Sequence, residues 1–184
     1  MSLSDYIARL RHRKGFGVHS PFAFTFLADT VGYPGHYYDD ILLAEACDGL
    51  PRRLRRLARL VHRTVARMSP RAAVITQEVP APLVVGAMLA DSRLKPTAAI
   101  PAEFGPRTLM VATAPELSGR EDILSRLLAA PDNILILTGT RLCPAPALQA
   151  SEALRGGWQF SDTDTSIFIS SDRTAPVELR VKLV

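Results

Sequence analysis

The chain has 184 residues, of which 47% are hydrophobic and 22% are charged, and its formal net charge is +4 at pH 7. That length lets one domain, or one domain with an arm, bury a full core, and the composition is that of a soluble globular protein. No apolar run approaches the roughly 20 residues that span a bilayer, and none follows the charged N-terminal segment, so we expect neither a membrane span nor a secretory signal. The two cysteines, Cys47 and Cys143, have no disulfide framework around them, which favours a reduced, cytoplasmic protein.

Residues 1–50 are rich in helix signals and are expected to form a helical arm. Ser20 is a good N-cap, and Pro21 suits the first position of a helix, where no amide hydrogen is needed. Glycines lie between the helical patterns, and they favour helix ends because glycine readily adopts the left-handed conformation found there. The predicted helices of the arm cover 3–13, 21–31 and 40–46.

The clearest predicted helix covers 51–68. Apolar side chains recur along it at i, i+3, i+4 and i+7 spacing, which predicts that this face packs on the core. A stripe of arginines lies on the opposite face, with no acidic residue between positions 51 and 71 to neutralise it. The stripe comprises Arg52, Arg56, Arg59, Arg63 and Arg67. Two interpretations are open: the stripe contacts phosphates, nucleic acid or an acidic protein, or it is the solvated outer face of an amphipathic helix.

The remaining residues alternate between strand and helix patterns. Strands are predicted at 72–78, 96–100, 108–112 and 133–138. Helices are predicted at 82–92, 118–130 and 145–154, the second with Ser118 as its N-cap and Glu121 in a capping box. The segments 158–161, 165–170 and 177–184 alternate with period two, as antiparallel strands do. Together these patterns predict an α/β fold with a mainly parallel sheet.

The segment from Lys14 to Phe24 contains Gly-Val-His-Ser-Pro-Phe at residues 17–22. It resembles the N-terminal signature of a family of bacterial class I S-adenosylmethionine-dependent methyltransferase-like proteins. The order of elements is also similar over nearly the whole chain, including a final Leu-Arg-Val-Lys-Leu strand. The resemblance implies a Rossmann-like methyltransferase-type sheet over residues 51–184, mainly parallel with antiparallel C-terminal strands, preceded by the N-terminal helical arm. It also implies S-adenosylmethionine as the cofactor.

Most residues that such a cofactor site needs are missing. After the first predicted strand, where cofactor-binding relatives are expected to have a glycine-rich loop, the chain has Glu-Val-Pro-Ala-Pro at residues 78–82. Each proline lacks an amide hydrogen and has φ fixed at about −65°, so the loop cannot present a row of N–H groups. The carboxylates that remain near strand ends, Glu78 and Glu103, are the candidate cofactor-binding residues.

Two functions are therefore predicted as alternatives. In the favoured one, the chain is methyltransferase-like, has lost its cofactor site, and acts by binding a polyanion or an acidic protein through the arginine helix. In the other, it is an active methyltransferase of unknown acceptor that holds S-adenosylmethionine through Glu78, Glu103 and backbone groups. A homo-oligomer is compatible with both.

Smaller features point to chemistry less directly. The segment Thr138-Gly139-Thr140-Arg141 either binds an anion, with hydroxyls, amides and a guanidinium acting together, or is a polar turn after a strand. His19 is either a base or ligand contact at the mouth of a site, or an imidazole that fixes the turn before Ser20, and we favour the second role. The histidines and cysteines lack metal-ligand spacing, so no metal is expected.

Overall fold

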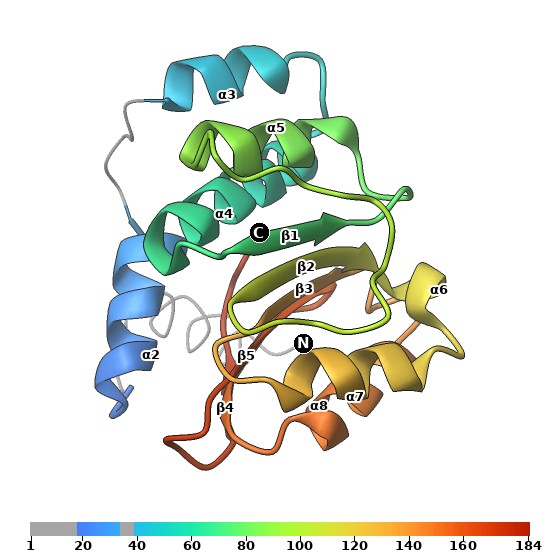
Figure 1. The fold of residues 1–184 in the computed structure, drawn as a ribbon. Helices are drawn as coiled ribbons and strands as arrows, with labels where there is room; N and C mark the ends of the chain where they lie inside the picture. Colours follow the sequence, from blue (N-terminus) through green and yellow to red (C-terminus); the bar gives the residue numbers. More distant parts are fainter. Residues whose placement is uncertain (1–17, 34–38) are drawn as a thin grey trace.

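A six-stranded mixed sheet divides the molecule into three layers, with helices on both of its faces (Figure 1). The computed structural model describes residues 18–33 and 39–184, so the helix predicted over 3–13 lies outside the described residues. The strands are β1 (Ala72–Ile75), β2 (Thr108–Thr113), β3 (Ile134–Thr138), β4 (Gly157–Ser161), β5 (Thr165–Ser170) and β6 (Val177–Arg180). Their order across the sheet is β1-β2-β3-β5-β4-β6.

One strand of the sheet runs against the others. β5 pairs antiparallel with β3 and β4, whereas the pairs β1–β2, β2–β3 and β4–β6 are parallel. The mainly parallel sheet is confirmed, but the prediction that the last strand is also antiparallel is wrong. Since β5 is antiparallel to β4, it ends beside the start of β4, where Gly157 N donates to Thr174 O at 3.2 Å. The chain therefore begins β6 at the same end of the sheet as β4 and runs parallel to it. An edge strand with one exposed face shows a period of two in either direction.

Helices cover the two faces unequally (Figure 1). One face carries α2 (Pro21–Phe26), a π-helical turn η1 (Leu27–Val31), α3 (Asp40–Ala46), α4 (Arg52–Met68) and α5 (Ala81–Ala90). The other carries α6 (Ala114–Leu117), α7 (Glu121–Ala129) and α8 (Ala145–Ala153). The helices predicted at 21–31, 40–46, 51–68, 82–92 and 145–154 are confirmed to within two residues.

Strand residues alternate between two hydrophobic cores. In β2, Leu109 and Val111 belong to the core beneath α4 and α5, and Met110 and Ala112 belong to the core beneath α7 and α8. Because both faces are covered, the central strands are continuous apolar runs in the sequence. The carboxyl ends of β1, β2 and β3 meet at one edge, which is where open α/β sheets place their ligands.

Aromatic side chains join α2 to the sheet. Phe22 stacks on Trp158 with ring centroids 4.0 Å apart, and Phe26 stacks on Phe160 at 5.0 Å. Ser20 caps α2 by accepting a hydrogen bond from a first-turn amide, as predicted, and its Oγ also accepts from Trp158 Nε1 at 3.0 Å. The described part of the N-terminal arm therefore shares a core with residues 51–184.

Residues 96–100 do not form the predicted strand. Only Thr97 forms a bridge, parallel to Val74 of β1. Residues 97–99 are exposed, so the segment pairs with β1 at one residue instead of adding a strand, and β1 lies at the edge.

The helix predicted over 118–130 begins later than expected. α7 starts at Glu121 with Arg120 at its N-cap, and no side chain caps it, so the prediction of Ser118 as N-cap is wrong. The reason is that residues 114–117 already form α6, and Ser118 ends that helix in an extended conformation. Gly119, at φ +75°, then turns the chain into α7.

Candidate functional site

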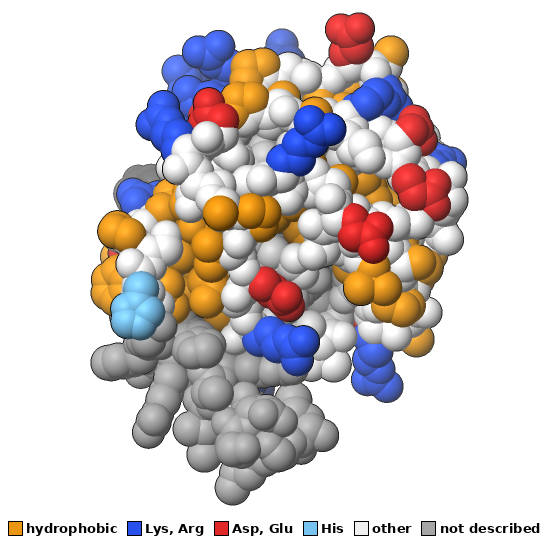
Figure 2. Space-filling model, turned by 90° about the horizontal axis from the view of Figure 1, so that it is seen from below, with side chains coloured by type: hydrophobic (Ala, Val, Ile, Leu, Met, Phe, Trp, Pro, Cys, Tyr) orange, Lys and Arg blue, Asp and Glu red, His pale blue; other side chains and the backbone are white. Residues whose placement is uncertain are grey.

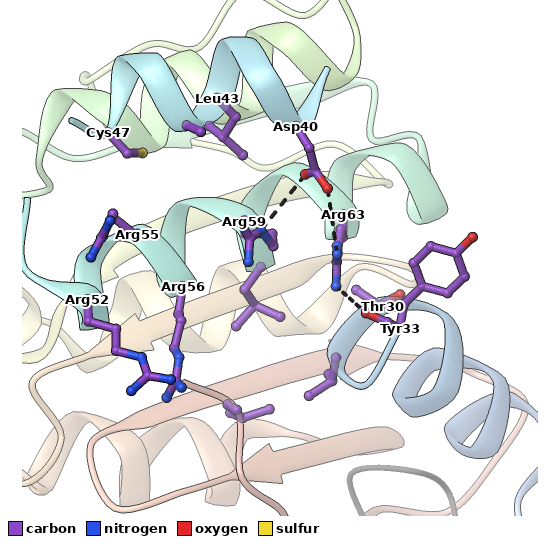
Figure 3. Close-up of a pocket in the computed structure, with 14 residues that line it drawn as sticks. Thr30, Tyr33, Asp40, Leu43, Cys47, Arg52, Arg55, Arg56, Arg59 and Arg63 are labelled. Atoms are coloured by element: carbon purple, nitrogen blue, oxygen red, sulfur yellow. Dashed lines mark hydrogen bonds and ion pairs between the residues drawn. The ribbon is translucent and has the colours of Figure 1, made fainter. Parts of the chain in front are cut away.

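The arginine face of α4 lines a cavity bounded also by α3, η1 and the C-terminal segment (Figure 3). The cavity encloses about 450 Å³. α4 presents its arginines there because its apolar side chains are buried against the sheet, as its periodicity predicts. Five guanidinium groups line this arginine cavity, from Arg52, Arg55, Arg56, Arg59 and Arg63.

One carboxylate, from Asp40 of α3, balances part of this charge. Its two oxygens lie 3.8 Å from Arg59 Nε and 4.0 Å from Arg63 Nη2 (Figure 3). Arg63 is 6% exposed, donates to the backbone oxygen of Tyr33 at 3.0 Å, and lies 5.6 Å from the centroid of the Tyr33 ring. The interpretation of the stripe as a solvated outer face is therefore wrong for Arg63, because Asp40 of α3 and Tyr33 lie against its side chain.

The opposite end of the cavity carries positive charge without this balance. Arg52, Arg55 and Arg56 form no ion pair with any residue in 18–33 or 39–184. Figure 3 shows the guanidinium groups of Arg52 and Arg56 converging beside the C-terminal segment, from which Leu183 lines the cavity. The charge of the cavity is thus graded from the Asp40 end to the Arg52 end.

The predicted stripe and the observed cavity differ at both edges. Arg67 is exposed near the end of α4 and does not line the cavity. Arg55 does line it and was missed, although at 100° per residue it lies only 60° from Arg52 on the helix. The position of α3 decides which edge of the stripe is enclosed.

Charge is distributed differently on the side formed by α7 and α8. Figure 2 shows Asp and Glu side chains scattered among Lys and Arg side chains there. One example is Arg126, which pairs with Asp122 at 2.9 Å, one helical turn away. The arginine cavity is therefore a local concentration of charge and not a property of the entire surface.

The thiol of Cys47 also lines the arginine cavity. Burial raises the pKa of this thiol, while Arg59 and Arg55 act in the opposite direction and more weakly. Cys47 is therefore protonated near neutral pH and behaves as an apolar wall rather than as a nucleophile.

A second, more open groove lies at the carboxyl ends of β1, β2 and β3. It spans about 810 Å³ and is lined by Glu78, Glu116, Thr138 and Gly139, among others. Thr76 Oγ1 donates to the Glu116 carboxylate at this edge. This groove occupies the place where a cofactor would lie in a sheet of this kind.

The loop after β1 offers this groove few hydrogen-bond donors. Pro80 and Pro82 have no amide hydrogen, Val79 N donates to Thr76 O at 3.1 Å, and Leu83 N donates to Pro80 O at 3.0 Å. Most of the loop's amides are therefore absent or satisfied within the protein, so backbone recognition of a phosphate or carboxylate is weak here.

The candidate cofactor carboxylates are not brought together. Glu78 lines the groove, whereas Glu103 is exposed in the connection before β2 and does not line it. The Arg141 side chain is exposed, and its backbone N donates to Asp164 Oδ1 at 3.0 Å. Because Gly139 N also donates to Asp164, at 2.9 Å, the amides of the 138–141 turn are used internally, as in an ordinary polar turn.

His19 is exposed and lines neither the arginine cavity nor the groove. Its ring forms no hydrogen bond with residues of the described segments. Within the described segments, His19 therefore does not form the turn-fixing bond expected of it, and Ser20 caps α2 through its own hydroxyl.

Some other kinds of site are not found in the described part of the chain. No group of three or more His, Cys, Asp or Glu residues there is arranged to hold a metal ion. Within 18–33 and 39–184, no helix has the length and apolar character needed to cross a membrane. Cys47 and Cys143 are both free.

The arrangement is therefore suited to binding an anion in a concave, strongly basic site. The comparisons with protein-family models, with curated proteins and with solved structures found no match to this chain.

Proposed function

We propose that this chain is a methyltransferase-like protein that does not transfer methyl groups and acts by binding an anionic ligand in the arginine cavity. The observation that carries the proposal is the charge at the Arg52 end, where Arg52, Arg55 and Arg56 have no acidic partner among the described residues. Positive charges on one wall raise the local electrostatic potential and repel one another. A bound anion lowers that potential and reduces the repulsion. Guanidinium groups also form charge-assisted, bidentate hydrogen bonds with phosphate and carboxylate groups.

The methyltransferase-like part of the proposal draws on sheet topology and on the Gly-Val-His-Ser-Pro-Phe segment. A mainly parallel sheet with one reversed strand near its C-terminal edge fits the expectation from that resemblance. The non-catalytic part draws on the loop after β1, whose prolines and satisfied amides leave little for a cofactor to bind. Within the arginine cavity, Asp40 lies beside two guanidinium groups and Cys47 is protonated, so neither is suited to act as a general base.

A second candidate function is an active methyltransferase of unknown acceptor. The open groove at the carboxyl ends of β1–β3 favours it, because that groove includes Glu78 and has space for a small molecule. S-adenosylmethionine would lie there with Glu78 as the acceptor of hydrogen bonds from its ribose.

Isothermal titration calorimetry separates the two candidates. We expect pyrophosphate to bind saturably and S-adenosylmethionine and S-adenosylhomocysteine to give no saturable heat. Saturable binding of S-adenosylhomocysteine that is lost in Glu78→Ala would support the second candidate instead. Glu103→Ala is the matched control, because Glu103 is an exposed glutamate outside the groove. If pyrophosphate gives no heat and no rise in melting temperature, the proposed function is wrong.

A further inference from the structure

The size of the arginine cavity restricts what its ligand can be. Its volume of about 450 Å³ lies within the range of small-molecule sites, roughly 300–1,000 Å³. It is bounded by α3, α4, η1 and the C-terminal segment rather than forming an open stripe along one helix (Figure 3). A small ligand fits such a space better than a polymer that must run across a surface.

The charge gradient orients that ligand. Asp40 lies at one end beside Arg59 and Arg63, and repels an anion there. Arg52 and Arg56 converge at the other end (Figure 3), so an anionic group binds most favourably between them. Two planar guanidinium forks match the several oxygens of a phosphate group, each of which accepts hydrogen bonds.

The walls between these ends are apolar. Leu43 of α3, Leu60 of α4 and Leu183 of the C-terminal segment each line the cavity. The protonated thiol of Cys47 and the methyl group of Ala44 extend the same wall on α3. An apolar group attached to the anion would therefore leave water on binding, which adds favourable free energy in proportion to its buried area.

Recognition of single-stranded nucleic acid fits this cavity poorly. Proteins that bind single strands stack successive bases on aromatic side chains. Among the described residues that line the cavity, Tyr33 is the one aromatic residue, and its ring already lies against Arg63. The described lining of the cavity thus has charge for a phosphate, and its single aromatic ring is no platform for a row of bases.

We infer that the ligand of the arginine cavity is a small organic phosphate, with its phosphate held by Arg52, Arg55 and Arg56 and an apolar group packed against Leu43 and Leu60. This inference rests on the proposed function, since it names the class of anion that the cavity binds. It distinguishes a phosphate ester with an apolar part from free inorganic phosphate and from a nucleic acid.

The test is titration calorimetry of the full chain at low ionic strength with phenyl phosphate, inorganic phosphate and a single-stranded RNA. We expect phenyl phosphate to bind at least about tenfold more tightly than inorganic phosphate, from burial of its ring. The double variant Arg52→Gln/Arg56→Gln should bind phenyl phosphate at least about tenfold more weakly, since hydrogen bonds to charged groups are lost. Arg67→Gln is the matched control: it removes an arginine of the same helix that lies outside the cavity, and should leave the affinity unchanged.

A second variant keeps every arginine and fills the space. Ala44 is exposed on α3 and lines the cavity, so Ala44→Phe should abolish phenyl phosphate binding while the melting temperature stays near that of the unsubstituted chain. Retained binding in Ala44→Phe would overturn the inference, as would equal affinities for phenyl phosphate and inorganic phosphate. If RNA binds through Arg52 and Arg56 while phenyl phosphate does not, the inference is wrong and the proposed function stands. If neither these ligands nor pyrophosphate binds, both are wrong.

Discussion

Replacing Asn133 with alanine should destabilise the protein more than any exposed substitution of the same kind. Asn133 precedes β3 and is 0% exposed. Its Oδ1 accepts from Thr108 N at 2.7 Å, and its Nδ2 donates to Leu127 O at 2.8 Å. This single side chain therefore ties the start of β2 to α7, across the core between the sheet and the helices.

The size of the effect follows from the two groups that Asn133→Ala leaves behind. A buried polar group that loses its partner costs about 1–3 kcal/mol. With the Thr108 amide and the Leu127 carbonyl both affected, we expect a loss of about 2–6 kcal/mol in the free energy of unfolding. That is a large part of the 5–15 kcal/mol typical of a domain.

Urea denaturation followed by circular dichroism measures this loss, provided that the slope with denaturant stays constant. Gln77→Ala is the control, because it removes the same kind of amide from an exposed position and should change stability by less than about 0.5 kcal/mol. A loss below about 1 kcal/mol for Asn133→Ala, at an unchanged slope, would show that the two hydrogen bonds do not contribute as argued.

Three further substitutions test other parts of the structure. Asp40→Asn leaves the buried Arg63 guanidinium without this carboxylate, so stability should fall by about 1–3 kcal/mol in urea denaturation, while calorimetry should show tighter binding of phenyl phosphate because a repelling charge is gone. Burial lowers the pKa of His62 below its usual value of 6.5, so the unfolded chain takes up the proton first as the pH falls. The urea midpoint should therefore decrease as the pH is lowered from about 7.5 to about 5.5. His62→Leu should reduce that decrease, and an equal decrease in the variant would refute the attribution of this pH dependence to His62. Gly157 has φ +115°, and a Cβ there would overlap the Ile169 carbonyl oxygen, so Gly157→Ala should cost at least about 3 kcal/mol, and a melting temperature within a degree or two of the original would contradict this.

Several features of the protein follow from the sequence alone because they depend on neighbours in the chain. The apolar repeat over 51–68 predicts α4 nearly to the residue, because side chains at this spacing share one face only if the segment is helical. The run over 133–138 predicts β3 as a central strand covered on both faces, and Ser20 followed by Pro21 predicts the start of α2. Each signal is contained within one helix, one strand or one helix start.

Features that depend on contacts between distant segments could not be predicted in this way. The direction of β6 depends on where the loop after β5 meets Gly157. Residues 96–100 pair with β1 through Thr97 alone, and residues 97–99 stay exposed. The same holds for the functional site. The helical pattern marks a stripe of arginines, but α3 decides that Arg55 is enclosed and Arg67 is not.

The charges of α4 show most clearly what the sequence determines and what only the folded structure decides. Along the chain, no acidic residue falls between positions 51 and 71, so nothing in the sequence distinguishes one arginine of α4 from another. In the folded protein, Asp40 lies beside Arg59 and Arg63, whereas no carboxylate of residues 18–33 or 39–184 pairs with the cavity arginines at the Arg52 end. Periodicity determines which side chains share a face, because it is set by backbone geometry. Which of those side chains are paired, buried or available to a ligand is decided only when another element packs against that face, because electrostatic interactions depend on distance in space and on exclusion of water.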